Sequence, residues 1–471
     1  MNRTAIFLAA AGVLALIALV VGLPQPKHNV VNPTPVIVTS SPGPTVANDG
    51  SIKMSARLSH PYVGTGTSDV FVTIDLNGVE VPGATRTPVN LALVIDRSGS
   101  MSGFKLQQAK MAARQLVSQL RATDRLAIVH YGGDVKSLDG VFCTEANKEK
   151  LLRYIDNIWD EGGTNIGAGL TTGRDMLMAT MSDFRVNRLV LISDGQPTEG
   201  IQDSGGLTEL TRAIRGSGIS VTSIGVGTDF NEDLMQAIAE TGGGAYAFLQ
   251  DASQLSTIFQ KDLNQAGTQV AQGVSLTFEL PPGMELREVL GYRLAFTDGR
   301  RAMIKLPDFS SGQLERVVAR VTVSAPSAGQ SFDVTSLKLD YMDLLKGNAV
   351  SSGARLAAMT TDKADVVWAN RDKDATVFAA RAQSAQNTQA AADALKAGDR
   401  AKAQKLLQNN AFFFEEAAKV AGEGAVAKDV QEQREWNDNF KNANTDEEIQ
   451  AASKGAKRKA RLDFGLQTST Y

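Results

Sequence analysis

Three oxygen-bearing side chains at alternate positions, Asp96, Ser98 and Ser100, are the residues most suited to chemistry in this sequence. They follow the apolar run 90–95, and a helix-forming segment begins at Phe104. A carboxylate and two hydroxyls, on the turn from a buried strand into a helix, are ligands that suit a hard divalent cation such as Mg²⁺. Serine also caps helices, so the motif taken alone predicts an N-cap equally well.

Two later segments supply further polar residues. Thr164 lies in the Gly-rich loop 162–167, and Asp194 follows the strand-like run 187–193. In an open parallel α/β sheet, the loops at the carboxyl ends of the strands meet in one crevice. We therefore expect Thr164 and Asp194 to lie close to Asp96, although they are far apart in sequence.

This combination of residues, in this order, resembles the metal-ion-dependent adhesion site (MIDAS) of von Willebrand factor type A (VWA) domains. The resemblance covers roughly residues 88–263 and matches the family pattern at all five positions. It implies that the site holds Mg²⁺, or alternatively Mn²⁺ or Ca²⁺, and leaves one coordination position for an acidic residue of a partner protein. The implied metal ligands are Asp96, Ser98, Ser100, Thr164 and Asp194.

Chemistry assigns each ligand a role. The two serine hydroxyls should ligate directly, and the two carboxylates should supply negative charge, directly or through water. Thr164 is the ligand expected to bind or release as the site changes state. Two carboxylates leave a divalent cation underneutralised, so an incoming Glu or Asp would complete both its charge and its coordination.

Other polar residues near the expected site have different explanations. Gly163, Asn165 and Glu199 are predicted to shape the partner-binding rim, with a direct metal role for Glu199 as the weaker alternative. The acidic residues of the segment 229–233 suit the start of the following helix, where carboxylates favour the helix dipole. His130 ends a strand and is predicted to be a packed or turn residue rather than a ligand.

The elements that must position these residues alternate between strand and helix patterns. Strands are predicted at 91–95, 126–131, 135–141, 189–193, 221–226 and 245–249. Helices are predicted at 105–120, 148–158, 170–181, 207–215, 232–240 and 254–264. This alternation predicts an α/β fold with a doubly wound, mostly parallel sheet. The third strand follows a Gly-Gly-Asp turn, so we expect it to be an antiparallel edge strand.

Segments on both sides of this region have the pattern of short antiparallel strands. Before it come 52–58, 70–76 and, less clearly, 79–82; after it come 274–280, 288–296, 302–306, 314–323 and 332–341. Three strands alone are marginally stable. We therefore expect the flanks to pair into one β-sandwich with the VWA domain inserted, an arrangement similar to bacterial VWA proteins and the inter-alpha-trypsin inhibitor heavy chains. Two unrelated β pieces are the alternative.

The C-terminal part is rich in Ala, Lys, Asp and Gln. Segments 365–396 and 400–421 are predicted to form a helical hairpin, with Gly398 as the C-terminal cap of the first helix and Asp399 as the N-cap of the second. The remainder is predicted to be a polar tail, in which the basic cluster 454–461 forms a solvated helix face.

The N-terminal segment predicts where in the cell the protein lies. Residues 5–23 are apolar and uncharged, and Arg3 precedes them. Eighteen helical residues span about 27 Å, roughly the hydrocarbon thickness of a bilayer. By the positive-inside rule, everything after Pro24 should lie outside the cytoplasm. We predict a bacterial single-pass cell-membrane protein with a signal anchor and its bulk in the periplasm or outside the cell; secretion after signal cleavage is the alternative.

The chain is therefore divided as follows: 1–23 signal anchor, 24–49 Pro-rich spacer, 50–87 first β segment, 88–265 VWA domain, 266–345 second β segment, 362–422 helical hairpin and 423–471 polar tail. The spacer cannot bury a core and is expected to hold the folded part clear of the bilayer.

Composition narrows the functional class. A hydrophobic content of 43% and a charged content of 21% are ordinary for a globular protein, and a net charge of −3 gives no electrostatic case for nucleic acid. The sequence has three histidines, none near the cluster, and no nucleophile–base pair. We predict a non-enzymatic protein-binding module. The alternatives are an adaptor for an AAA+ ATPase and a metal-dependent hydrolase.

Overall fold

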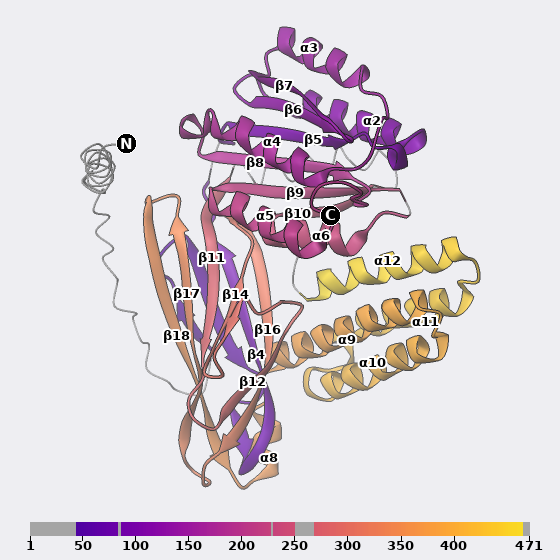
Figure 1. Ribbon diagram of the computed structural model, residues 1–471. Helices are drawn as coiled ribbons and strands as arrows, with labels where there is room; N and C mark the ends of the chain where they lie inside the picture. The colour runs from indigo at the N-terminus through magenta and orange to yellow at the C-terminus, as the bar shows by residue number, and fades with distance from the viewer. Residues whose placement is uncertain (1–43, 83–85, 228, 250–267, 465–471) are drawn as a thin grey trace, which may run out of the picture. The chain divides into compact units, whose positions relative to one another are not determined.

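A computed structural model describes residues 44–82, 86–227, 229–249 and 268–464 (Figure 1). The predicted signal anchor, 1–23, and the predicted helix 254–264 lie outside these residues. Within the described ranges, no helix is both long and apolar enough to cross a membrane.

A six-stranded sheet, in the order β10-β9-β8-β5-β6-β7, forms the centre of the α/β region. Its strands are β5 (Val89–Asp96), β6 (Arg125–Tyr131), β7 (Val135–Phe142), β8 (Val186–Ser193), β9 (Ile219–Val226) and β10 (Gly243–Leu249). Neighbouring strands are parallel except for β6 and β7, which form the predicted antiparallel edge pair. Every residue of β5, β8 and β9 is buried, as a parallel sheet covered on both faces requires.

Helices cover both faces of this sheet (Figure 1). One face carries α2 (Phe104–Gln119) and α3 (Glu145–Asp156); the other carries α4 (Ile166–Met178), α5 (Ser204–Gly216) and α6 (Glu232–Gly242). Along β5, Leu91, Leu93 and Ile95 pack on the first face, whereas Ala92 and Val94 pack on the second. The predicted doubly wound arrangement is therefore confirmed.

The two flanks pair into one β-sandwich, as predicted. The first sheet is antiparallel and joins strands from before and after the α/β region: β1 (Thr45–Ala47), β2 (Ile52–Leu58), β4 (Gly66–Gly78), β16 (Leu314–Ala325) and β12 (Met284–Leu290). The α/β region is inserted in the chain after β4, and β16 is paired with β4 along the whole length of β16.

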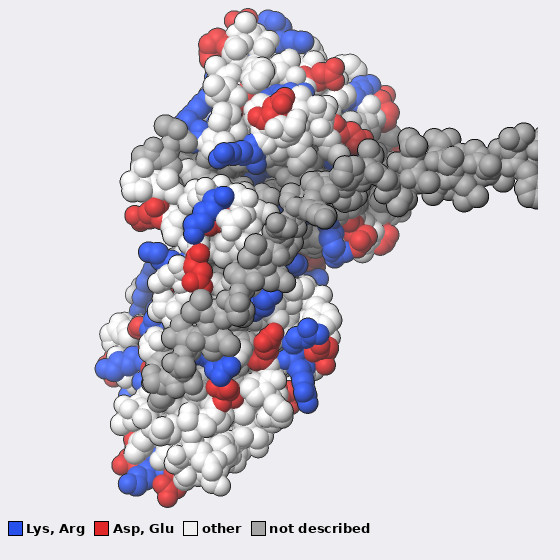
Figure 2. Space-filling model, turned by 90° about the vertical axis from the view of Figure 1, so that its left-hand side faces the viewer, with Lys and Arg blue, Asp and Glu red and all other residues white. Residues whose placement is uncertain are grey.

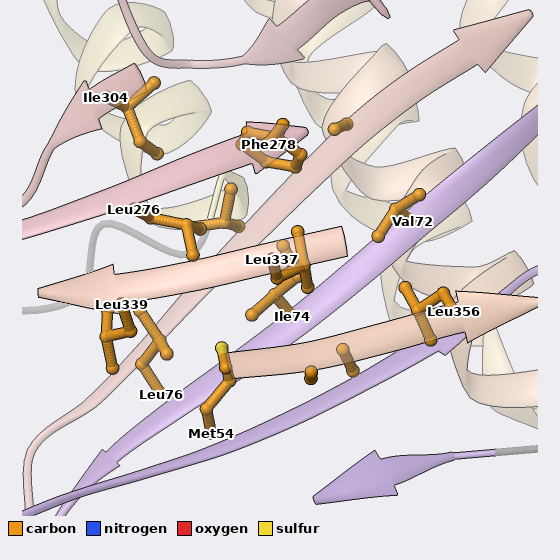
Figure 3. Packing of buried hydrophobic residues seen from close by; sticks show 14 of the residues in the cluster. Met54, Val72, Ile74, Leu76, Leu276, Phe278, Ile304, Leu337, Leu339 and Leu356 are labelled. Atoms are coloured by element: carbon orange, nitrogen blue, oxygen red, sulfur yellow. The ribbon is translucent and has the colours of Figure 1, made fainter. Parts of the chain in front are cut away.

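The second sheet follows the order β13-β14-β11-β17-β18-β3, with β15 paired to β11. These strands are β13 (Phe296–Thr297), β14 (Arg301–Lys305), β11 (Gln269–Glu279), β17 (Ser331–Asp343), β18 (Asn348–Thr361), β3 (Tyr62–Gly64) and β15 (Phe309–Ser310). Figure 3 shows Met54, Ile74 and Leu76 of the first sheet packing towards Leu276 and Leu339 of the second. Apolar side chains of the two sheets therefore share one core.

Several sequence-based boundaries were wrong. The segment predicted as spacer, 24–49, is described only from residue 44, and β1 within it pairs with β2. No strand forms at 79–82. Strand β18 falls in the gap left between 345 and 362, because its small residues, Ala, Ser and Gly, have little strand preference. Its pairing with β3 is parallel, so the sandwich is not wholly antiparallel.

The C-terminal helices are α8 (Ala364–Ala369), α9 (Lys373–Lys396), α10 (Arg400–Ala421), α11 (Ala427–Asn442) and α12 (Asp446–Asp463). Helices α9 and α10 form the predicted hairpin. Gly398 between them has φ +83°, and the side chain of Asp399 accepts a hydrogen bond from the N–H of Lys402, as expected for the two caps. The segment 423–471 is not a polar tail where it is described, because it forms α11 and α12.

The basic cluster 454–461 on α12 is not a solvated face. Lys457 is 7% exposed and its Nζ lies 2.8 Å from Asp393 of α9 and 3.5 Å from Asp233 of α6. Arg461 is 4% exposed and lies 3.1 Å from Glu240 of α6. These side chains are buried because acidic residues of two other helices pair with them.

Candidate metal site

Two carboxylates stand at the carboxyl ends of adjacent strands. Asp96 is the last residue of β5, and Asp194 directly follows β8, which pairs with β5 in parallel so that Ile95 lies opposite Ile192. Both aspartates are fully buried, at 0% exposure. Their spacing follows from the parallel register, which ends both strands at one edge of the sheet.

Hydrogen bonds fix the side chain of Asp96. Its Oδ1 accepts from the backbone N–H of Ser98 at 2.9 Å, while its Oδ2 accepts from the hydroxyls of Ser193 at 2.6 Å and Tyr131 at 3.2 Å. Burial raises the pKa of Asp96 to about 6; these hydrogen bonds act against the rise, and the neighbouring Asp194 adds to it. The raised pKa of Asp96 therefore reflects chiefly the burial of its carboxyl group.

The side chains of the two serines in the turn do not cap a helix. Ser98 precedes the 3₁₀ helix η1 (Gly99–Met101) but makes no side-chain capping hydrogen bond, and the N-cap of α2 is Gly103. The hydroxyl oxygens of Ser98 and Ser100 instead lie 3.1 Å apart. The helix-capping alternative therefore does not account for them, and their paired oxygens are suited to ligating a cation.

One carboxylate oxygen of Asp194 has no partner in the part of the chain that the structure describes. Its Oδ2 accepts from Nζ of Lys105 at 3.2 Å, but its Oδ1 is buried and accepts no hydrogen bond from any described residue. A buried carboxylate oxygen is rarely left unpaired, since its desolvation is then uncompensated. A cation, or a water bound to a cation, would give this oxygen the partner that it lacks among the described residues. The residues present therefore fit a divalent cation.

The loop that carries Thr164 meets the same edge. The backbone N–H of Gly99 donates to the carbonyl of Gly162 at 3.1 Å, which ties this loop to the serine turn. Thr164 is 3% exposed; its N–H donates to the hydroxyl of Thr198 at 2.9 Å, and its carbonyl accepts from the N–H groups of Thr198 and Glu199. The Thr164 hydroxyl takes no part in these contacts.

The three predicted rim residues have different surroundings. Asn165 is the N-cap of α4, and its side chain accepts from the N–H of Ala168 at 3.0 Å. Glu199 is exposed, and its carboxylate lies so close to Gly163 that a Cβ there would collide with it. Gly163 therefore leaves room for Glu199, while Asn165 stabilises the helix that follows the loop.

The sequence reasoning missed three residues that contact the aspartates: Ser193, Tyr131 and Lys105. Ser193 and Tyr131 each end a strand adjacent to β5, so their positions in the sequence indicate that they lie near Asp96. Lys105 stands in the first turn of α2, where a cation is unfavourable for the helix dipole. A basic residue in the first turn of this helix, nine residues after Asp96, therefore indicates that its side chain pairs with an acidic residue outside the helix.

Asp229 also differs from its prediction. The N-cap of α6 is Asn231, whose side chain accepts from the N–H of Leu234. Asp229 instead lies 2.8 Å from Nζ of Lys105, which therefore bridges Asp229 and Asp194.

His130 lies away from the cluster. Its ring packs against Tyr154 of α3, with centroids 5.5 Å apart, whereas the next residue, Tyr131, bonds Asp96 from the opposite face of the sheet. Burial lowers the pKa of His130 to about 4, with the charges of Arg97 and Lys136 acting in the same direction. Across the described ranges, no three His, Cys, Asp or Glu side chains come together as a metal site, so binding here would depend on hydroxyl ligands.

Comparisons with known proteins show which family the α/β region resembles. Residues 90–261 match the family described as von Willebrand factor type A domain. The chain is 32% identical over 211 residues to the uncharacterized protein YfbK of Escherichia coli (43% of this chain, 36% of that protein) and 24% identical over 265 residues to inter-alpha-trypsin inhibitor heavy chain H2 of Mus musculus (55% and 28%). The aligned part thus spans about a third of the length of these relatives.

Two solved structures share the fold over most of the chain. One is a von Willebrand factor type A protein from Catenulispora acidiphila, with a TM-score of 0.64 and 15% identity over 91% of this chain and 99% of that one. The other is the ArnB paralog VWA2 from Sulfolobus acidocaldarius, with a TM-score of 0.55 and 17% identity over 88% and 99%. The chain therefore contains a VWA domain and is related through it to YfbK and the inter-alpha-trypsin inhibitor heavy chains.

Proposed function

We propose that this protein is a membrane-tethered, extracytoplasmic binding module that holds an acidic side chain of a partner protein through Mg²⁺ at the five MIDAS residues. The observation that carries the proposal is the buried Oδ1 of Asp194, which has no partner among the described residues and stands at the same sheet edge as Asp96 and the turn that carries Ser98 and Ser100. When bound, the cation supplies an electrophilic coordination position that a partner carboxylate can fill.

The surroundings of the site favour binding over catalysis. His130, the histidine nearest to Asp96 in sequence, packs on the opposite face of the sheet, and its lowered pKa keeps it neutral. A hydrolytic metal site would need a general base within reach of the bound water. We therefore propose a role without catalysis, in keeping with the VWA match.

Exposed aromatic side chains adjoin the site in the chain and supply partner-contact area. Phe104 is 66% exposed and begins α2 directly after the serine turn. Trp159 is 60% exposed and lies two residues before Glu161, whose N–H donates to the carbonyl of Arg97. Aromatic residues are enriched in protein–protein interfaces. On the face shown in Figure 2, basic and acidic side chains are interspersed, which favours a protein partner over nucleic acid.

The binding proposal is tested by capturing partners from envelope extracts of the native organism, with Mg²⁺ or with EDTA. Wild type should retain a protein in Mg²⁺ and lose it in EDTA, and Asp194→Asn should retain none. Asp183→Asn is the matched control, because Asp183 is exposed and lies before the opposite end of β8. Equal capture by Asp194→Asn and the control would contradict the proposal.

The membrane tether rests on residues 1–23 and needs its own test. Deleting them should move the protein from the membrane fraction to the soluble fraction. A C-terminal alkaline phosphatase fusion to the full chain should be active, since that enzyme requires the oxidising side of the membrane. Activity of a cytosolic reporter alone would instead favour an adaptor for a cytosolic AAA+ ATPase.

A further inference from the structure

Lys105 reaches into the metal site from α2. Its Nζ lies 3.2 Å from Oδ2 of Asp194 and 2.8 Å from Oδ1 of Asp229. The Lys105 side chain is 17% exposed, Asp194 is buried, and Asp229 is 63% exposed. One ammonium group thus bridges a buried carboxylate of the MIDAS set and a carboxylate at the surface.

The position of Lys105 is costly unless these contacts compensate for it. The first turn of a helix disfavours a cation. Burial lowers the pKa of Lys105, but hydrogen bonds and charges from Asp229 and Asp194 outweigh it, so the pKa lies above its ordinary value. The side chain therefore stays charged and supplies positive charge to the buried carboxylate of Asp194.

We infer that Lys105 is a tethered counter-ion that competes with the divalent cation for Asp194, and that Asp229 receives its ammonium group when the cation binds. This inference rests on the proposed metal site. It adds a residue outside the five MIDAS positions that sets the affinity of the site.

The competition follows from charge and geometry. An ammonium group and a divalent cation that share the Asp194 carboxylate would lie a few ångströms apart, and even at an effective dielectric constant of about 20 their repulsion exceeds thermal energy. The lysine side chain is long and flexible, and Asp229 is already in contact with its Nζ. Lys105 can therefore leave Asp194 and keep Asp229 without a change in the fold.

The competition has a functional consequence. With Lys105 displaced only at a cost in free energy, the metal alone should bind weakly. A partner carboxylate that ligates the metal makes the free energy of metal binding more favourable and offsets the cost of displacing Lys105. Lys105 therefore lowers occupancy by the metal alone, so that stable occupancy depends more strongly on the partner carboxylate that ligates the metal.

The test is isothermal titration of MgCl₂ into the full chain and into Lys105→Met. Loss of the competing cation should tighten Mg²⁺ binding by about tenfold. Lys110→Met is the matched control: Lys110 lies on the same helix, and its Nζ donates to the carbonyls of Asp156 and Ile158, so Mg²⁺ affinity should stay at the wild-type value. Asp229→Asn should weaken Mg²⁺ binding about threefold, since the displaced ammonium group loses its second carboxylate.

Thermal unfolding supplies a second readout. Without metal, Lys105→Met should unfold at a lower temperature than wild type, because the buried carboxylate of Asp194 loses its counter-ion, and added MgCl₂ should raise its unfolding temperature more than that of wild type. If Lys105→Met does not fold, Lys105→Gln, which keeps a hydrogen-bond donor, takes its place.

The outcomes separate the two proposals. Wild type that binds Mg²⁺ with the same affinity as the Lys105 variant overturns the role of Lys105 alone. Binding by the variant but not by wild type supports that role and overturns the metal occupancy proposed for the native chain. Absence of binding in both overturns both.

Discussion

Two buried aspartates in this molecule have opposite surroundings. Asp308 of the sandwich is 7% exposed, and its two oxygens bind Arg215 of α5, the hydroxyl of Ser220 at 3.2 Å and the N–H of Gly273 at 3.0 Å. Asp194 is 0% exposed, and its side chain has a single partner, Lys105, while Oδ1 has none among the described residues.

The difference separates a structural carboxylate from a binding one. Hydrogen bonds at both oxygens make Asp308 a joint between the VWA domain and the sandwich, and further ligands would have no acceptor to use. The unsatisfied oxygen of Asp194 stores an unfavourable desolvation energy that a ligand can relieve. Each substitution below should therefore affect either stability or metal affinity, but not both equally.

The largest expected effect is on stability at the joint. Asp308→Ala leaves the guanidinium of Arg215 buried without its carboxylate, which should lower the free energy of unfolding by about 3 kcal/mol. Denaturant titration of the metal-free protein measures this change. The folded variant should bind Mg²⁺ with the same affinity as wild type. A decrease in the free energy of unfolding of less than about 1 kcal/mol would show that the contact between Asp308 and Arg215 is not structural.

The next effect is the pH dependence of the proposed metal site. The pKa of Asp96 is about 6 in the fold and 3.8 ordinarily, so the folded state binds more protons than the unfolded state between these values. The metal-free protein should therefore gain stability as pH falls from 6 to 4. Mg²⁺ requires the deprotonated carboxylate, so its affinity should fall about tenfold from pH 7 to pH 5.

Calorimetry at the two pH values measures the affinity, and denaturant titration measures the stability. Asp96→Asn is the control for stability, because it removes the titrating group: its unfolding free energy should change less between pH 6 and pH 4 than that of wild type. Equal Mg²⁺ affinity at pH 7 and pH 5 would contradict the raised pKa.

The smallest effect is expected from a neutral ligand. Ser100 is exposed and its hydroxyl lies 3.1 Å from that of Ser98. Ser100→Ala removes one neutral oxygen and should weaken Mg²⁺ binding by about threefold to tenfold, with unfolding free energy within about 0.5 kcal/mol of wild type. Fluorescence-monitored unfolding and calorimetry on the same sample compare the two. A larger loss of stability than of affinity would assign Ser100 to the fold.

The sequence predicted those parts of the molecule that depend on local pattern. Strands β5 and β8 contain the apolar runs 91–95 and 189–192, and the rule that parallel strands end at one edge placed Asp96 near Asp194. The pairing of the flanks followed from too few strands before the α/β region to fold alone. These arguments need only periodicity and topology.

The rest depends on contacts distant in sequence. Lys105 meets partners 89 and 124 residues away, and no local pattern indicates them. The charges of Lys457 and Arg461 predict that this face of helix α12 is exposed to solvent. In the structure, acidic residues of α6 and α9 pair with them. Strand β18 was missed because neighbouring strands, rather than its own small residues, stabilise it.

The most direct test of the central claim is titration of Mg²⁺ into the wild-type chain, Asp96→Ala and Asp194→Ala. One Mg²⁺ should bind per wild-type chain, and both variants should lose affinity by about 100-fold or more, with circular dichroism spectra unchanged. Unchanged Mg²⁺ affinity in both folded variants would contradict the central claim.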